Sequence, residues 1–464
     1  MKRRIFLMII TASASMLLAG CMKLGPDFKR PDMGSQVRGS YQHAPSDVEM
    51  GKITDRWWTT FNDSKLDQLA ENVLSNNLDI IKALAVISEL QAYFVQSRAN
   101  RLPSLSIQGE VRRQHIPPGI ESDVYSLSLP ASFEVDLWGR LARAEEAALA
   151  NLAKTEENAR TIAQTIVSEA ITLYFQIESL ERRIQITEQS IENYRRNLSF
   201  IERRYEGGLT SILDLKQARR VLAQTEATLP SLRQDIGIKQ QKLAVLSGQY
   251  PETRSARIQP EDYFKLPALV PSGLPSHLLL RRPDIRAAEA NLRALNAKIG
   301  VAKASRFPRI TLTGTFGYSS SELDRLFIPG NSLWNIAFGA LQPIFDAGKL
   351  KSGQRAAEAQ LQQGMADYAK IVLTAFSEVE SALLTRKEQM ERRGKMLDFL
   401  AEARATQRIA ENRYERGLVD YLTVLDAQRT RFQAEESLVL VELTILSNRV
   451  TLHRALGGGW GEPE

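Results

Sequence analysis

The chain has 464 residues, of which 25% are charged and 43% hydrophobic, so it is long enough to form a large folded body. Its formal net charge is +6, but three of these charges, Lys2, Arg3 and Arg4, lie in a leading segment without acids, and 6 − 3 leaves about +3 for the remainder. That balance gives no electrostatic reason to expect a nucleic-acid partner. The single cysteine, Cys21, excludes a disulfide within the chain and a cysteine-rich metal site.

The first twenty residues are typical of a secretory signal. The basic residues precede an apolar run, 5–18, that is too short to cross a bilayer. Small residues before Cys21 resemble a bacterial lipoprotein cleavage site, which predicts a lipoprotein signal peptide over 1–20 and an acylated N-terminal extension over 21–65. Met22 follows, rather than an acid, which for such lipoproteins favours the outer membrane. The alternative is an ordinary signal peptide with an incidental cysteine.

The remaining sequence is written twice. The segment Arg204 to Leu209 returns 209 residues later as Arg413 to Leu418, and the two copies differ only where Gly207 is replaced by Arg416. A period near 200 is far longer than that of a solenoid, so it predicts two copies of a whole domain. The predicted units are repeat 1 at 66–247, a connector at 248–282, repeat 2 at 283–456 and a C-terminal tail at 457–464.

Each repeat predicts a helix, a β-hairpin, a long helix and a shorter helix. In repeat 1 the first helix is 66–102, with an interruption near Asn76-Asn77, and the hairpin is about 104–135. The long helix is 140–206, and the shorter helix is 211–247, with a kink at Pro230. In repeat 2 they are 283–307, about 309–345, 349–416 and 420–456. At about 1.5 Å per residue each long helix would extend roughly 100 Å, a length that no compact globule accommodates.

The hairpin strands alternate apolar residues with Ser, Thr, Gln and Glu, which predicts one apolar and one polar face. Each strand has about ten residues, the length that a tilted strand needs to cross a bilayer. A soluble sandwich is the alternative, but two helices of roughly 100 Å offer it no compact second layer.

Four strands cannot close a barrel, so several chains would share one. Two chains would give eight strands with a filled interior, and three would give twelve strands with a lumen; we favour three. The two shorter helices of each repeat match one long helix when stacked, so each chain would offer about four helical columns and three chains twelve. The predicted fold is therefore mainly α with membrane β: a trimeric 12-strand β-barrel continuous with a 12-helix periplasmic α-barrel, with two internal repeats per chain. An ordinary antiparallel coiled coil is the simpler alternative for the helices.

Several motifs together resemble the TolC type of outer-membrane factor, in the lipoprotein branch that serves drug- or metal-efflux pumps. They are Cys21 with 25–31, Trp57-Trp58, 274–285, 345–350 and 421–429. The resemblance implies a homotrimer in the outer membrane of a Gram-negative bacterium, lipid-anchored, in contact with outer-membrane lipid and extending into the periplasm. It would be the passive exit duct of a tripartite efflux pump, receiving drugs or other small toxic compounds from an inner-membrane transporter through a periplasmic adaptor.

The resemblance also assigns a periplasmic gate to the last motif. Leu422 would form an apolar ring, Asp426 a ring of carboxylates, and Arg429 would latch neighbouring helices through acidic groups. The simpler alternative is that Asp426 and Arg429 form only a surface pair three residues apart on one helix.

The turns that follow the long helices would be the adaptor docking tips. They contain Gly207, Gly208 and Leu209 in repeat 1 and Gly417 and Leu418 in repeat 2. Glycine permits the positive φ of such a turn, and an exposed leucine offers an apolar contact. A plain helical turn would explain the glycines equally well.

No enzyme, cofactor or metal site is expected. The four histidines are scattered along the sequence, at His43, His115, His277 and His453, and no nucleophile–base pairing or phosphate loop is visible. The alternative function from another class is a structural lipoprotein that spans the envelope without transporting anything.

Overall fold

The computed structural model describes residues 23–31, 40–43, 56–251, 264–265, 270 and 275–458. Cys21, the signal segment 1–20, most of the connector and the end of the tail lie outside these ranges. The chain divides into two compact units. The first comprises Met1–Met33, Ala85–Asn158 and Ile285–Ile371, and the second comprises Gly34–Leu84, Ala159–Asp284 and Val372–Glu464.

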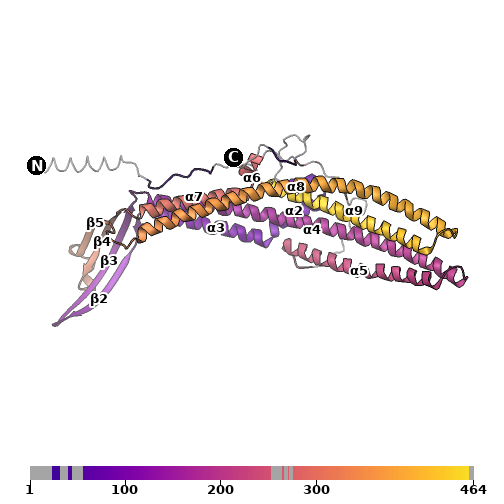
Figure 1. Cartoon of the computed structure of the whole chain (residues 1–464). Helices are drawn as coiled ribbons and strands as arrows, with labels where there is room; N and C mark the ends of the chain where they lie inside the picture. Colours follow the sequence, from indigo (N-terminus) through magenta and orange to yellow (C-terminus); the bar gives the residue numbers. More distant parts are fainter. Residues whose placement is uncertain are drawn as a thin grey trace. The chain divides into compact units, whose positions relative to one another are not determined.

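The first unit contains an antiparallel sheet in the order β1-β3-β4-β5, with β2 also paired to β3 (Figure 1). The strands are β1 (Ser104–Leu105), β2 (Gln108–Ile116), β3 (Ile120–Val135), β4 (Arg309–Ser320) and β5 (Ser332–Leu341). The hairpins of the two repeats therefore join through β3 and β4 to make one sheet. Within the described residues β2 and β5 each pair with one strand only, so both are edges.

The pairing register gathers the apolar residues of three strands on one face, because residues directly opposite each other in a sheet share a face. One row joins Phe133, Leu312 and Phe338 across β3, β4 and β5. The next apolar rows are Ala131, Gly314 and Ile336, and then Leu129, Phe316 and Trp334. The opposite face carries rows such as Ser132, Thr313 and Ala337, and Pro130, Thr315 and Asn335.

The second hairpin ends earlier than the sequence pattern predicts. The expected range reaches 345, whereas β5 ends at Leu341. Pro343 has no backbone N–H to donate to the ladder, so pairing stops in front of it. The Gln342 side chain instead donates to the carbonyl oxygens of Arg306 (3.1 Å) and Pro343 (3.0 Å).

Two motifs of the first unit have clear structural roles. Asp346 accepts hydrogen bonds from the backbone N–H groups of Gly348 and Leu350, both at 2.9 Å, and so caps the start of α8 (Lys349–Glu415). The segment 23–31 forms an N-terminal strap against the start of α4 (Arg140–Glu206) and against α7 (Pro283–Ala304). This strap lies outside the two repeats but contacts both of them.

The strap is held by its backbone as well as by side chains. The N–H of Leu24 donates to the carbonyl of Trp138 at 3.1 Å. The guanidinium of Arg143, whose side chain is 2% exposed, donates to the Asp27 carboxylate at 2.8 Å. Gly25 has φ +98°, and a Cβ there would lie 2.6 Å from the Cα of Gly300, so only glycine allows this approach.

The second unit is helical. Its elements are η2 (Trp57–Phe61), α2 (Ser64–Asn76), the start of α3 (Leu78–Ala99), the ends of α4 and α8, α5 (Ile212–Leu246), α6 (Pro275–Arg281) and α9 (Tyr421–Ala455). The predicted first helix is thus two helices that meet at Asn77, and α6 is a short helix that the sequence reading placed inside the connector. Among the described residues, no helix is both long and apolar enough to cross a membrane.

Asn77 explains the break between α2 and α3. Its side-chain oxygen accepts from the N–H groups of Asp79 (2.9 Å) and Ile80 (3.2 Å) and so caps α3. Its side-chain nitrogen donates to the carbonyl of Leu246 at 2.8 Å, near the end of α5. One buried asparagine therefore ends one helix, begins the next and ties both to a third.

The remaining motifs build the core of the second unit. Trp57 and Trp58 are 1% and 6% exposed and pack with residues of α2, α4 and α9. Arg282, which is 8% exposed, binds Asp284 at 2.6 Å and Glu378 at 2.8 Å. It also donates to the last carbonyl of α9, at Ala455 (3.1 Å), so it links the connector, α8 and the end of α9.

Candidate channel gate and docking tips

The two turns after the long helices have the same hydrogen-bond pattern. At the end of α4, the N–H of Leu209 donates to Arg204 (2.8 Å) and that of Gly208 to Tyr205 (2.9 Å). At the end of α8, Leu418 donates to Arg413 and Gly417 to Tyr414, each at 2.9 Å. Both glycines are left-handed, with φ +72° and +73°. This is the Schellman ending, which satisfies the last carbonyls of a helix.

The turns present their leucines to the surface. Leu209 is 69% exposed and Leu418 is 60% exposed, and neither is buried by its own chain. The two turns that the sequence assigned to adaptor docking therefore each expose one leucine, and docking itself stays a prediction. Gly207 lies in the first turn, one residue before the left-handed glycine.

The helices that leave the turns begin with side-chain caps of different kinds. Ser211 forms a capping box with Asp214 at the start of α5. Asp420 accepts from the N–H and the hydroxyl of Thr423 at the start of α9. These two hydrogen bonds lower the pKa of Asp420. Both turns are therefore fixed on both sides, by a glycine ending and by a cap.

The predicted gate residues lie along the first turns of α9. The side chain of Leu422 is 56% exposed. The Arg429 guanidinium donates to the Asp426 carboxylate at 3.0 Å, with side-chain exposures of 68% and 64%. Within one chain this is the simple surface pair three residues apart, and its contribution to stability is about 0.5 kcal/mol or less. The three residues thus occupy one exposed region, and none is used by the fold of the single chain.

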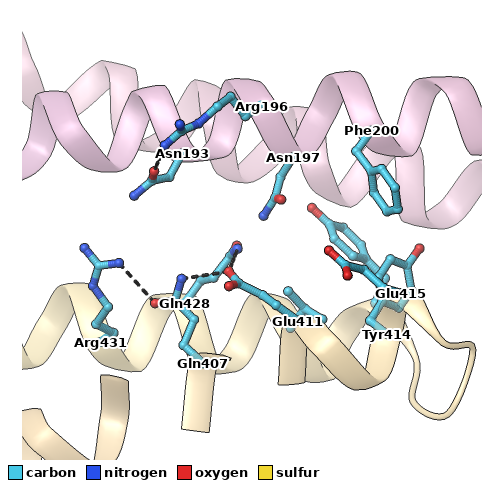
Figure 2. A pocket seen from close by; sticks show the side chains of 12 residues that line it. Asn193, Arg196, Asn197, Phe200, Gln407, Glu411, Tyr414, Glu415, Gln428 and Arg431 are labelled. Atoms are coloured by element: carbon cyan, nitrogen blue, oxygen red, sulfur yellow. Dashed lines mark hydrogen bonds between the residues drawn. The ribbon is translucent and has the colours of Figure 1, made fainter. Parts of the chain in front are cut away.

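A hollow of about 350 Å³ lies beside the gate region, between α4 on one side and α8 with α9 on the other (Figure 2). Asn193, Arg196, Asn197 and Phe200 line it from α4, and Glu411, Tyr414, Gln428 and Arg431 line it from the opposite wall. The Gln428 side chain donates to Glu411 at 2.8 Å, and Arg431 donates to Gln407 at 3.3 Å. These bonds join α8 to α9.

The chain matches the family described as outer membrane efflux protein over residues 69–249 and 274–458. The two matched segments correspond to the two repeats. The chain belongs to the outer membrane efflux protein family.

Relatives of this outer membrane efflux protein match nearly its whole length. SrpC of Pseudomonas putida, a solvent efflux pump outer membrane protein, is 33% identical over 458 residues, 96% of this chain and 97% of SrpC. The cation efflux system protein CusC of Escherichia coli K12 is 32% identical over 448 residues, 96% of this chain and 98% of CusC. SilC of Salmonella typhimurium, described as a probable outer membrane lipoprotein, is 31% identical over 98% of this chain and 99% of its own length.

Solved structures share the fold. The outer-membrane channel OprN matches with a TM-score of 0.88 at 29% identity, covering 95% of this chain and 100% of OprN. A CusC structure matches with a TM-score of 0.85 at 31% identity, covering 94% of this chain and 100% of CusC. The efflux protein described here is therefore an outer-membrane channel component that extends into the periplasm, as the sequence predicted.

Several residues beside the tips were not found from the sequence. Arg204 stacks on Phe200 (5.7 Å to the ring centroid) and on Tyr414 of the other repeat (5.3 Å). Tyr414 in turn contacts Tyr421, with ring centroids 5.4 Å apart. The repeated Arg-Tyr dipeptide was the available signal, since Tyr205 and Tyr414 occupy matching positions. It could not tell which copy is buried: Tyr205 is 41% exposed and Tyr414 is 8% exposed.

Proposed function

We propose that three copies of this chain form the exit duct of a tripartite efflux pump. The duct would be a 12-strand barrel in the outer membrane joined to a 12-helix periplasmic tunnel. It would be gated at Leu422, Asp426 and Arg429 and would receive cargo from an inner-membrane transporter through a periplasmic adaptor. The two-faced sheet is the observation that carries the proposal.

The apolar face of the sheet is suited to lipid. Trp334, Ile336 and Phe338 are 75%, 73% and 69% exposed, so the described part of the chain does not cover them. The apolar positions of β3 run from Tyr125 to Val135, about 33 Å along the strand at about 3.3 Å per residue. At a tilt of about 40° they cover about 25 Å, the height of the apolar band on outer-membrane barrels.

The strand edges support sharing of the barrel between copies. β2 and β5 leave one edge each unpaired within the described chain, and an open edge in lipid costs several kcal/mol for each unsatisfied group. Pairing β5 of one copy with β2 of the next removes every edge in a ring. Three copies give twelve strands and a lumen lined by the serine and threonine rows, whereas two give eight strands with a filled interior.

The gate proposal rests on exposure and position. Leu422 and Asp426 lie four residues apart on α9 and so share a side of the helix. A threefold axis beside this side would gather three leucines and three carboxylates in a narrow passage. Like charges there oppose closure, so Arg429 would have to exchange its partner on its own helix for an acidic group on a neighbouring one.

The cargo class follows from the polar lining and from the relatives. The names of similar proteins specify solvents, toluene, pyoverdine and cations, which have no chemistry in common. A duct that serves such different pumps does not need a selective site. Small toxic compounds chosen by the transporter are therefore the proposed cargo of this chain.

The test of the duct and its gate is single-channel conductance in planar bilayers. Leu422→Ala should raise conductance several-fold because the passage widens and closure loses its apolar ring, and Arg429→Ala should raise it because closure loses its latch. The internal repeat offers a matched control, since Leu213 lies 209 residues before Leu422 and is 62% exposed. Leu213→Ala should leave conductance unchanged.

Each other outcome has a definite meaning. Equal conductance in all variants would reject the gate but keep the duct. No conductance in the parent or in any variant would reject the duct and favour a structural lipoprotein that spans the envelope. Docking is tested separately with a photoreactive residue at Leu418 or Leu209: crosslinks to an adaptor support the tips, and crosslinks only to the chain itself oppose them.

A further inference from the structure

Arginines on the antiparallel helices α8 and α9 generally face an acceptor on the other helix. Arg404 binds Glu435 at 2.9 Å, and Arg393 binds Glu442 at 3.0 Å. Farther along, the Asn448 side chain donates to the carbonyl of Ala382 at 2.9 Å. Beside this last cross-link, Arg386 lies one turn after Ala382 on α8 and Arg449 follows Asn448 on α9, so that two cations lie close enough for the charge of Arg386 to act on Arg449.

Arg449 is buried beneath η2. Arg449 is 6% exposed. Its terminal nitrogen Nη2 donates to the carbonyl oxygen (3.2 Å) and to the hydroxyl oxygen (3.0 Å) of Thr60. Its guanidinium carbon lies 4.6 Å from the ring centroid of Phe61. The Nε of Arg449 is buried and meets no acceptor within the described parts of the chain.

The cationic forms of both arginines are destabilised. Burial, and then the positive charge of Arg386, lower the pKa of Arg449 to about 10. Burial also lowers the pKa of Arg386. No carboxylate among the described residues contributes to either shift. The nearby acids are occupied, because Glu442 pairs with Arg393 and Glu380 accepts from the backbone of Gln42 and His43.

Further buried polar atoms surround this pair. Gln389 lies about one turn after Arg386, and its Oε1 has no partner in the described structure. His453 lies about one turn after Arg449, is 4% exposed and stacks on Trp57 with ring centroids 5.0 Å apart. Neither of its ring nitrogens meets a partner among the described residues. Burial and the charge of Arg449 lower the pKa of His453 to about 3, so it stays neutral.

We propose that Arg386 and Arg449 form a binding site for a small oxyanion of the phosphate class, at the place where Thr60 and Phe61 of η2 cover Arg449 of α9. A buried arginine beside a half-buried one, with no acid acting on either, favours an anion, and a guanidinium binds phosphate oxygens through two parallel hydrogen bonds. Inorganic phosphate is a mixture of monoanion and dianion at neutral pH; the two arginines favour the dianion, which balances both charges, whereas a monocarboxylate balances one. Bound phosphate would hold η2 against the helix pair.

The test compares phosphate with chloride at equal ionic strength and neutral pH, using the full-length protein in detergent. Isothermal titration with inorganic phosphate should show one site per chain, and Arg386→Gln should weaken binding at least tenfold. In chloride, Arg386→Gln should melt at or above the parent temperature, because it removes the repulsion. Phosphate should raise the melting temperature of the parent clearly more than that of Arg386→Gln.

Arg392→Gln is the matched control, since Arg392 is an exposed arginine on the same helix. It should keep the parent's phosphate response. Equal responses in the parent and Arg386→Gln would overturn the proposal, because phosphate also stabilises proteins by exclusion from their surface. Acetate binding as tightly as phosphate would overturn the charge matching. Arg386→Lys retains the charge and should retain most of the phosphate-dependent shift, which guards against misfolding of the glutamine variant.

Discussion

The two helical hairpins, α4 with α5 and α8 with α9, share a plan but differ in what they bury. Their long helices have 67 residues each and their short helices 35 each, and both turn through a left-handed glycine. Yet 18 residues of α9 are buried, against four of α5. The two hairpins therefore share a backbone plan but differ in side-chain burial: α9 belongs to the core of its unit, and α5 remains largely exposed.

The ion pairs follow the same division. Between α4 and α5, the pair Arg233–Glu188 has side chains that are 61% and 45% exposed. Between α8 and α9, the Glu442 side chain that binds Arg393 is 9% exposed. Burial is strong enough to raise the pKa of Glu442 even though the hydrogen bond and charge of Arg393 act to lower it. The second hairpin is thus where polar substitutions should matter most.

The largest expected effect comes from breaking the buried pair. Glu442→Ala should lower the free energy of unfolding by about 3 kcal/mol, because it leaves the Arg393 charge without its partner in a mostly buried position. Glu188→Ala, which breaks an exposed pair on the other hairpin, should cost less than about 1 kcal/mol. Thermal unfolding followed by circular dichroism in detergent measures both. Equal losses would show that burial does not distinguish the two hairpins.

Glu178 on α4 should make the protein less stable as the pH rises above neutrality. Burial first, and then the charges of Asp63 and Glu181, raise its pKa from 4.5 to about 8, against the lowering effect of Tyr174. The stability it contributes is complete below pH 4.5 and is lost as the pH rises through 8. Glu178→Gln should therefore match the parent melting temperature at pH 5 and exceed it at pH 9. A parallel decline of both proteins between these pH values would contradict the assignment.

His453 on α9 should have the opposite dependence. Its pKa falls from 6.5 to about 3, so the stability it contributes is present above pH 6.5 and is lost as the pH falls through 3. His453→Gln should flatten the fall in melting temperature between pH 6.5 and pH 4 and leave the alkaline side unchanged. If His453→Gln and the parent lose melting temperature equally between pH 6.5 and pH 4, groups other than His453 cause the loss.

The smallest expected effect is one that the hairpins should share. Alanine at Gly208 or Gly417 meets no atom within 4 Å but must adopt φ near +72°, which costs about 1 kcal/mol. The two substitutions should lower the melting temperature equally, although their surroundings differ. Gly394→Ala, in the interior of α8 with open space around it, should raise it instead. If the two substitutions lowered the melting temperature unequally, contacts other than the left-handed backbone would contribute to the stability of the turns.

The sequence predicted the elements better than their partners. The range without glycine or proline, 140–206, is the range of α4, because backbone preferences alone decide it. Alternation revealed two-faced strands but not that β3 would pair with β4 of the other repeat, since register depends on tertiary contacts. It also extended β5 past Leu341, because alternation continues through residues that Pro343 prevents from pairing.

The candidate sites show the same limit. Leu209 and Leu418 could be placed at exposed turns because glycine marks such turns locally. The gate stays a prediction, because Asp426 and Arg429 acquire their proposed partners only from other copies. Arg386 and Arg449 lie 63 residues apart in the sequence, and only the register between α8 and α9 brings them together.

The contacts of the strap limit how far a group attached to Cys21 can lie from the folded chain. Leu24 is bonded to Trp138, in the short link between β3 and α4, and Gly25 lies against Gly300. Only Met22 and Lys23 lie between Cys21 and Leu24, so an acyl group on Cys21 would begin within about 11 Å of that bond whatever path these residues take. A lipid on Cys21, which the sequence predicts, would therefore lie near the end of the sheet at which α4 begins. Inserting residues after Met22 would increase the distance that a lipid on Cys21 can reach from Leu24 and would leave the contacts of the strap unchanged.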